Sequence, residues 1–213
     1  LSASLEEYFL DSSLNTLQVS LTNGGTALFG SPAYCISFNQ TNVTVGGSSR
    51  VNYIAASVNN YSNFSISLWI YPTLLDMSNT YITVWSVTNS AVGGYSAELA
   101  LDGNGRNLVF LVNNDSNTSN RAFTAGQSIS LSTWYHVVCT CNSDSNIASI
   151  YVNGSLVKRT AMTNFTLNSY DWFGLGARFG QINGSSAKGF RGAMCFVNMF
   201  SDELTQTEVS QLY

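Results

Sequence analysis

Alternation of apolar and polar residues is clearest over residues 134–157 (WYHVVCTCNSDSNIASIYVNGSLV). This pattern predicts three consecutive antiparallel strands, over residues 134–141, 147–152 and 155–160. Asn153-Gly154 between the last two predicts a type I′ hairpin turn, because both residues tolerate a positive φ. The turn sets a register in which Ile150, Tyr151 and Val152 face Val157, Leu156 and Ser155. A meander of this kind makes antiparallel sheet the expectation for the rest of the chain.

A second strongly patterned run is FSISLWIYP, residues 64–72. Its alternation places four aliphatic or aromatic side chains on one face: Phe64, Ile66, Leu68 and Ile70. Trp69 and Tyr71 lie on the other face, which is either a second packed surface or a platform for a ligand. Pro72 has no backbone donor, so we expect the strand to end there.

Further strands are predicted over residues 5–10, 17–21, 33–38, 51–54, 81–88, 95–101, 107–113, 172–177 and 192–200. Residues 102–105 (DGNG) predict a second hairpin turn, and residues 179–188 a loop rich in Gly and Ser. A short helix should close the chain, with Thr205 or Thr207 as its cap and Glu203 or Glu208 near its positive end. Its predicted apolar side consists of Leu204, Val209 and Leu212.

Composition indicates a folded protein, and we interpret residues 1–213 as a single domain because all-β sandwiches of this length often have one core. Charged residues are only 9% of the chain, far below the usual ~25%. Eight Lys and Arg stand against twelve Asp and Glu, so the sequence lacks the basic stripe that nucleic acids require. Since no apolar run approaches the ~20 residues of a bilayer span, we expect no membrane insertion. The start at Leu1, without a basic leader, is expected for a processed protein or a domain of a longer one.

Four cysteines, Cys35, Cys139, Cys141 and Cys195, allow three pairings if all are oxidised. Cys139 and Cys141 share one face of a strand, and the alternative for any of the four is a small buried thiol. A zinc site is not expected, because the chain has a single histidine, His136, and no suitable pair of cysteine pairs.

Asn-X-Ser/Thr acceptor motifs for N-linked glycosylation are frequent and fall mostly in predicted turns and loops. They are at Asn39, Asn42, Asn60, Asn63, Asn114, Asn117, Asn153, Asn164 and Asn183. Their placement predicts an extracellular, cell-surface or virion-surface location.

Several motifs in one order carry a resemblance to a known family. They are Ser37-Phe38 after a proline-containing loop, FSISLWIYP, WYHV followed by YVNG, and a closing segment from Gly192 to Tyr213. Together they resemble a laminin-G-like or pentraxin-like domain of the concanavalin A-like lectin/glucanase superfamily. The resemblance implies a jelly-roll sandwich of two antiparallel sheets in which the first and last strands are neighbours.

The same resemblance implies that Cys35 lies near Cys195. A bridge between them would close a loop of about 160 residues, worth roughly 4–5 kcal/mol in the chain-entropy model. The resemblance does not extend to the pentraxin calcium site. At the positions where pentraxins have calcium ligands, this chain has Gly94-Tyr95 and residues 177–180 (ARFG). No cofactor is therefore expected, although a different calcium site near Asp102 or Asp144 stays open.

Catalysis is not expected from this sequence. Retaining glucanases need two carboxylates about 5–5.5 Å apart, and no strand here carries two acids at alternate positions. No Ser or Cys nucleophile motif such as G-x-S-x-G accompanies His136, so we interpret this histidine as a structural side chain.

Two functional hypotheses remain. The first is a glycan-binding or adhesion module whose partners are glycans or glycoproteins, with aromatic faces stacked on sugars and amides fixing their orientation. Its candidate ligand-binding residues are Tyr53, Tyr61, Asp102, Asn104, Asn114, Tyr170, Trp172 and Arg178. The alternative is a structural glycoprotein domain of a viral fibre, capsid or extracellular filament, assembled into homo- or hetero-oligomers. An unrecognised hydrolase is a third and weaker reading.

Overall fold

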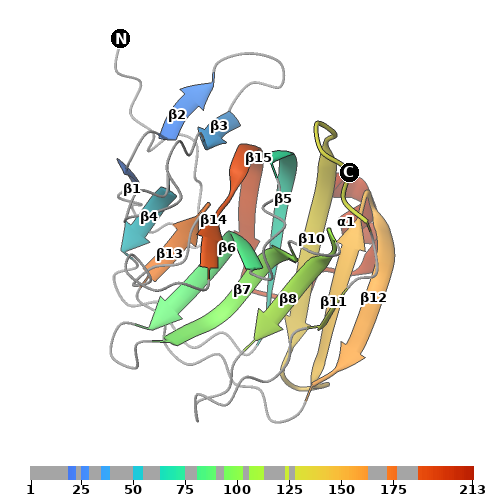
Figure 1. The fold of residues 1–213 in the computed structure, drawn as a ribbon. Coiled ribbons are helices and arrows are strands. Elements are labelled where there is room, and N and C mark those ends of the chain that lie inside the picture. Colours follow the sequence, from blue (N-terminus) through green and yellow to red (C-terminus); the bar gives the residue numbers. More distant parts are fainter. Residues whose placement is uncertain are drawn as a thin grey trace.

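The computed structural model is an all-β sandwich of two sheets with one short helix (Figure 1). It describes residues 19–22, 25–28, 35–38, 50–54, 63–74, 81–89, 94–102, 106–112, 123–124, 128–162, 172–176 and 187–213. The strands predicted over residues 5–10 and the turn after them lie outside this part of the chain. Within it, no helix is long and apolar enough to cross a membrane.

The first sheet, here called sheet A, joins strands from residues 19–124 to two later ones. In spatial order its strands are β1 (Val19–Thr22), β4 (Arg50–Ile54), β13 (Trp172–Leu175), β6 (Tyr81–Asn89), β7 (Gly94–Asp102), β8 (Leu108–Val112) and β9 (Phe123–Thr124). A further strand, β14 (Ala187–Gly189), pairs with β6 in parallel. It lies partly inside the loop predicted over residues 179–188, so that prediction is wrong at its end.

The second sheet, sheet B, is antiparallel throughout its described strands. Their spatial order is β12 (Ser155–Ala161), β11 (Ile147–Val152), β10 (Tyr135–Asn142), β5 (Asn63–Leu74), β15 (Arg191–Phe200), β3 (Cys35–Phe38) and β2 (Gly25–Leu28). The early strand beside β15 is therefore β3, whereas β1 pairs with β4 in the other sheet. The predicted adjacency of the two ends of the fold holds for β3 and β15.

The core lies between the sheets and is formed by the alternating faces that the sequence indicates. Phe64, Ile66, Leu68 and Ile70 of β5 are all fully buried in it, as predicted. Burial of each such side chain contributes about 1.5–3 kcal/mol. Leu99 and Phe110 meet them from sheet A.

The predicted meander is present as β10, β11 and β12. Tyr151 and Val152 face Leu156 and Ser155 as expected, but Ile150 faces Lys158 and not Val157. A register shift between Ile150 and Tyr151 places one extra residue in β12. Hairpin turn chemistry fixes the register only as far as the first bulge.

Pro72 does not end its strand, which corrects the sequence prediction. β5 continues to Leu74, and Pro72 lies opposite Gly192, next to a register shift in β15. A proline is tolerated at such an irregularity because the ladder needs no donor there.

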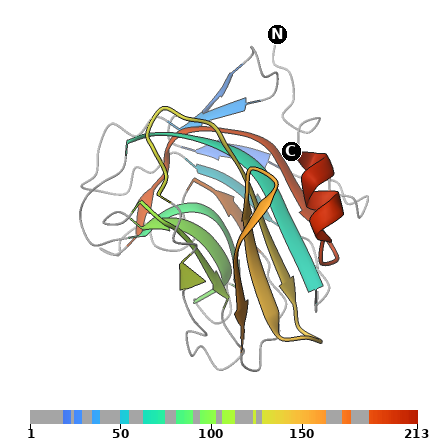
Figure 2. The ribbon, with the colours of Figure 1, turned by 90° about the vertical axis from the view of Figure 1, so that its right-hand side faces the viewer.

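The closing helix, α1 (Gln206–Leu212), has Thr205 as its N-cap in a capping box with Glu208. Figure 2 shows it on the side of sheet B that faces away from sheet A. There Val209 and Leu204 pack on Val138 and Tyr151 in a second small core. The third predicted apolar residue, Leu212, is exposed instead.

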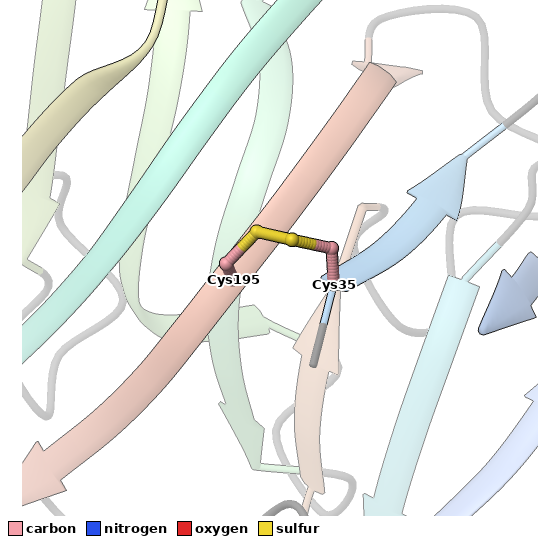
Figure 3. The surroundings of a disulfide bond; sticks show 2 residues. All are labelled: Cys35 and Cys195. Atoms are coloured by element: carbon pink, nitrogen blue, oxygen red, sulfur yellow. A yellow bond between two sulfur atoms is a disulfide. The ribbon is translucent and has the colours of Figure 1, made fainter. Parts of the chain in front are cut away.

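A disulfide joins Cys35 to Cys195, and their Cα atoms are 4.3 Å apart (Figure 3). The two residues face each other across β3 and β15. The pairing implied by the resemblance is therefore present. Cys139 and Cys141 are free thiols buried in the core.

Candidate functional site

Five ring-bearing side chains, in two contacting groups, lie along the outer face of sheet B. This aromatic strip consists of Trp69, Tyr71, Trp134, His136 and Tyr213. It includes the pair, Trp69 and Tyr71, for which the sequence left open a packed surface or a ligand platform.

Strand pairing brings the strip together. His136 is opposite Trp69 in the β5–β10 ladder, and Tyr135 is opposite Ile70, so Trp134 reaches Tyr71. Side chains at alternate positions of a strand share a face, which aligns the two cross-strand pairs. α1 then brings Tyr213 to the same face from the end of the chain.

The ring geometry divides the strip into two parts. The centroids of Tyr71 and Trp134 are 5.1 Å apart in a tilted arrangement. Trp69 and His136 are 5.3 Å apart, and Tyr213 stacks on both of them, at 5.7 Å and 6.0 Å. Aromatic pairs at such distances contribute about 0.5–1.5 kcal/mol beyond their buried area.

His136 is buried although it belongs to the outer face. Its Nε2 is 2.9 Å from the Ser67 Oγ, while its Nδ1 has no hydrogen-bond partner among the described residues. Its backbone N–H donates to the Asn153 Oδ1 over 3.0 Å, which ties it to the hairpin turn. Burial lowers its pKa from 6.5 to about 4, so the ring is neutral at pH 7.

The Tyr71–Trp134 end of the strip is partly open to solvent. Both side chains are partly exposed, and exposed hydroxyls of Thr73 and Ser132 lie in the two segments beside them. The Ser132 N–H donates to the Pro72 carbonyl over 2.8 Å, which holds those segments together. The four ring contacts of the strip include no charged side chain.

The predicted ligand-binding residues are spread over sheet A as far as the structure describes them. Trp172 begins β13 and pairs with Ile54 and Thr88, and Asp102 ends β7 and pairs with Tyr81. Thr88 and Tyr81 are at opposite ends of β6, so Trp172 and Asp102 are roughly 20 Å apart along that strand.

Tyr53, in β4, pairs with Phe173, the residue after Trp172, so Tyr53 and Trp172 lie in neighbouring strands. The structure therefore does not bring Asp102 into one site with these two residues. The other candidates, Tyr61, Asn104, Asn114, Tyr170 and Arg178, lie outside the described residues.

Two of the predicted glycosylation sites are described, and both amide oxygens have structural roles. The Asn63 Oδ1 accepts from the Ser143 N–H over 3.0 Å, and the Asn153 Oδ1 accepts from His136. Asn39, Asn42, Asn60, Asn114, Asn117, Asn164 and Asn183 lie outside the described part of the chain.

Most of the carboxylates that the structure describes form hydrogen bonds that stabilise the fold. Glu98 is fully buried and accepts from the Thr83 hydroxyl over 2.5 Å. The Asp202 carboxylate accepts from the Glu203 N–H, and the Glu203 carboxylate accepts from the Asn142 side-chain amide. The Glu208 carboxylate accepts from the Thr205 N–H. In this part of the chain no group of three or more His, Cys, Asp or Glu side chains could hold a metal ion.

The buried thiols are poor nucleophiles. Burial raises the pKa of both the Cys139 and the Cys141 thiol, so each stays protonated at neutral pH.

Sequence reasoning missed Trp134 and Tyr213 as members of a candidate site. The alternation in residues 134–141 places Trp134 on the face of His136 and Val138, which was a usable signal. The contact of this face with Trp69 and Tyr71 depends on the pairing of β5 with β10, which no local pattern reveals.

The family model described as the concanavalin A-like lectin/glucanases superfamily, of the third laminin G type, matches residues 45–210. The chain belongs to this family, in agreement with the two-sheet fold and the order of its motifs. No curated protein sequence matches it.

Solved structures with the same fold include binding domains of clostridial neurotoxins. The botulinum neurotoxin serotype G binding domain matches with a TM-score of 0.71 at 18% identity, over 95% of this chain and 47% of that one. Two structures of the binding domain of botulinum neurotoxin DC also match, both at 16% identity over 94% of this chain and 47% of theirs. Their TM-scores are 0.70 for the complex with rat synaptotagmin II and 0.68 for the complex with SialylT. The chain thus spans about half the length of these domains and shares their fold.

Proposed function

We propose that this chain is a non-catalytic carbohydrate-binding module whose sugar platform is the Tyr71–Trp134 pair. The observation that carries the proposal is a pair of aromatic rings, in contact and partly exposed, on the outer face of a rigid sheet. Aromatic faces stack on the C–H surfaces of sugar rings, and nearby hydroxyls such as those of Thr73 and Ser132 fix the orientation.

The composition of the strip favours neutral glycans. None of its five residues is Lys, Arg, Asp or Glu, and the chain has a formal net charge of −4, which repels anions. Sialylated glycans, of the kind bound in one of the neurotoxin complexes, should therefore bind more weakly than neutral hexose glycans.

A glycan array with matched neutral and sialylated structures, followed by titration calorimetry, tests this function. Tyr71→Ala and Trp134→Ala should each weaken binding at least tenfold while the protein remains folded by circular dichroism. Phe196→Ala is the control, because Phe196 is an aromatic residue outside the strip and is more exposed than Tyr71 or Trp134. An array without signal for any neutral glycan, or equal loss in the control, contradicts the proposal.

We infer the compartment from the disulfide. The Cys35–Cys195 bond is typical of secreted proteins, which fold in oxidising surroundings. We extend this to an extracellular, N-glycosylated protein that acts on glycans or glycoproteins. Neither the comparisons nor the strip supports adhesion or a place on a virion.

One observation favours the alternative, a structural role in assembly. Phe196 is 47% exposed and has φ +49° at the irregularity of β15. An apolar side chain held outward by an unfavourable backbone suits a contact with a second copy. Analytical ultracentrifugation of the chain and of Phe196→Ser decides: a multimer that this substitution dissociates supports assembly, and a monomer at high concentration contradicts it.

A further inference from the structure

The Trp69–His136 half of the aromatic strip is covered by a single side chain. Tyr213 stacks on both rings, with interplanar angles of 21° and 22°. This is the place and orientation that a sugar ring would take on Trp69.

The cover is lightly held. Tyr213 is 59% exposed, and its hydroxyl makes no hydrogen bond within the described part of the chain. Besides the two ring contacts, it lies against the hairpin turn, where a Cβ built on Gly154 would be 3.2 Å from the Tyr213 Cδ1. The helix itself has separate anchors on that turn: the Gln206 side chain and the Ser210 hydroxyl donate to the Gly154 carbonyl over 2.7 Å and 3.4 Å. Tyr213 can therefore move without detaching α1.

The ring beneath this cover carries an unsatisfied polar atom. Among the described residues the buried His136 Nδ1 has no hydrogen-bond partner, while the Nε2 of the same ring is 2.9 Å from the Ser67 Oγ. A buried polar atom without a partner costs about 1–3 kcal/mol, a cost that a ligand hydroxyl would remove.

We propose that Tyr213 is a displaceable lid over a second sugar subsite formed by Trp69 and His136. The proposal rests on the proposed function, because this subsite continues the Tyr71–Trp134 platform. Trp69 and Tyr71 are two residues apart on β5, roughly 7 Å, so neighbouring rings of one glycan can reach both. The ligand class is a neutral oligosaccharide of at least two hexoses. Its second ring stacks on Trp69, and one of its hydroxyls bonds to the His136 Nδ1.

Calorimetry with a neutral hexose and with its linear disaccharide, on the parent chain and on Tyr213→Ala, tests the lid. Binding to a covered subsite is weakened by the fraction of molecules that are closed. Tyr213→Ala should therefore bind the disaccharide at least about fivefold more tightly and leave the affinity for the monosaccharide unchanged. Tyr213→Phe, which keeps the ring, should behave like the parent, and so should Leu212→Ala at the neighbouring exposed position.

The single histidine gives a second readout. In ¹⁵N-histidine spectra, the Nδ1 resonance should shift on addition of the disaccharide and not of the monosaccharide. If Tyr213→Ala binds the disaccharide no more tightly and the Nδ1 resonance does not move, the lid is wrong although the platform stands. If neither protein binds either sugar, both proposals are wrong.

Discussion

Gly192 of β15 lies directly on the backbone of Tyr71. A Cβ built on this glycine would be 1.9 Å from the Tyr71 carbonyl oxygen and 3.0 Å from the Pro72 Cα. Gly192 also has φ +141°, a conformation that L side chains rarely adopt. The strand that carries the proposed sugar platform thus depends on the absence of a side chain in its neighbour.

Gly192→Ala should therefore lower the free energy of unfolding by more than about 3 kcal/mol, because the clashing atoms are backbone and cannot turn aside. Gly154→Ala is a matched comparison, since Gly154 also has positive φ but the nearest atoms to its added Cβ belong to the Tyr213 side chain, at 3.2–3.4 Å. Its expected cost is about 1–2 kcal/mol. Urea unfolding of the two variants measures both values, and equal losses would mean that β15 can shift away from β5.

The Cys35–Cys195 bond should be a major source of stability. It spans 160 residues, so its removal releases the unfolded chain from a very long loop. A Cys35→Ser, Cys195→Ser double variant should lose roughly 4–5 kcal/mol in urea unfolding. Addition of reductant should destabilise the parent and leave the double variant unchanged. If mass spectrometry shows that the parent is fully reduced and its free energy of unfolding is nevertheless unchanged, this account is wrong.

The local pattern of the sequence predicts antiparallel strands and much of the core, whereas the two-sheet sandwich is implied by the resemblance to the family. Alternation is a property of neighbouring residues, so the buried face of β5 and the Tyr151–Leu156 pairing could be predicted without knowledge of the fold. The bulge in β12 that shifts the register between Ile150 and Tyr151 could not, because β12 is mostly exposed and has no buried face to mark its register.

Only part of the aromatic strip could be predicted from the sequence, for a different reason. Trp69 and Tyr71 were recognised as an unusual outer face, but their partners come from residues more than 60 positions away. Trp134 joins them through strand pairing and Tyr213 through the docking of α1. Both are tertiary contacts without a local signature, so the sequence pattern indicated aromatic residues in loop-like segments instead.

Removal of the helix cap should loosen the support of Tyr213. The Glu208 N–H donates to the Thr205 Oγ1 over 3.3 Å, and the Thr205 N–H donates to the Glu208 Oε2 over 2.7 Å. Thr205→Ala should cost about 1 kcal/mol in the free energy of unfolding. Thr207→Ala, inside the same helix and exposed, should be neutral or slightly stabilising because alanine is the better helix former. Chemical denaturation of both variants checks this, and a larger loss for Thr207→Ala would show that the cap is not what holds the helix.

Acid should destabilise the fold through His136. Burial lowers its folded pKa from 6.5 to about 4, so between these values the unfolded chain binds a proton that the folded chain does not. The contribution is complete above pH 6.5 and is lost progressively as the pH falls to about 4, for a total of about 3 kcal/mol.

His136→Gln separates this effect from that of the carboxylates. The Glu208 pKa is also lowered, chiefly by its bond to the Thr205 N–H, and its contribution is lost in the same direction but at lower pH. Urea unfolding of the parent from pH 7.5 to 4.5 should therefore show a decline that is absent from the variant above about pH 5. Proton NMR of the single histidine gives an independent value: a ring that titrates in the folded protein near pH 6.5 would show that solvent reaches it beneath Tyr213, and the predicted acid sensitivity would then be absent.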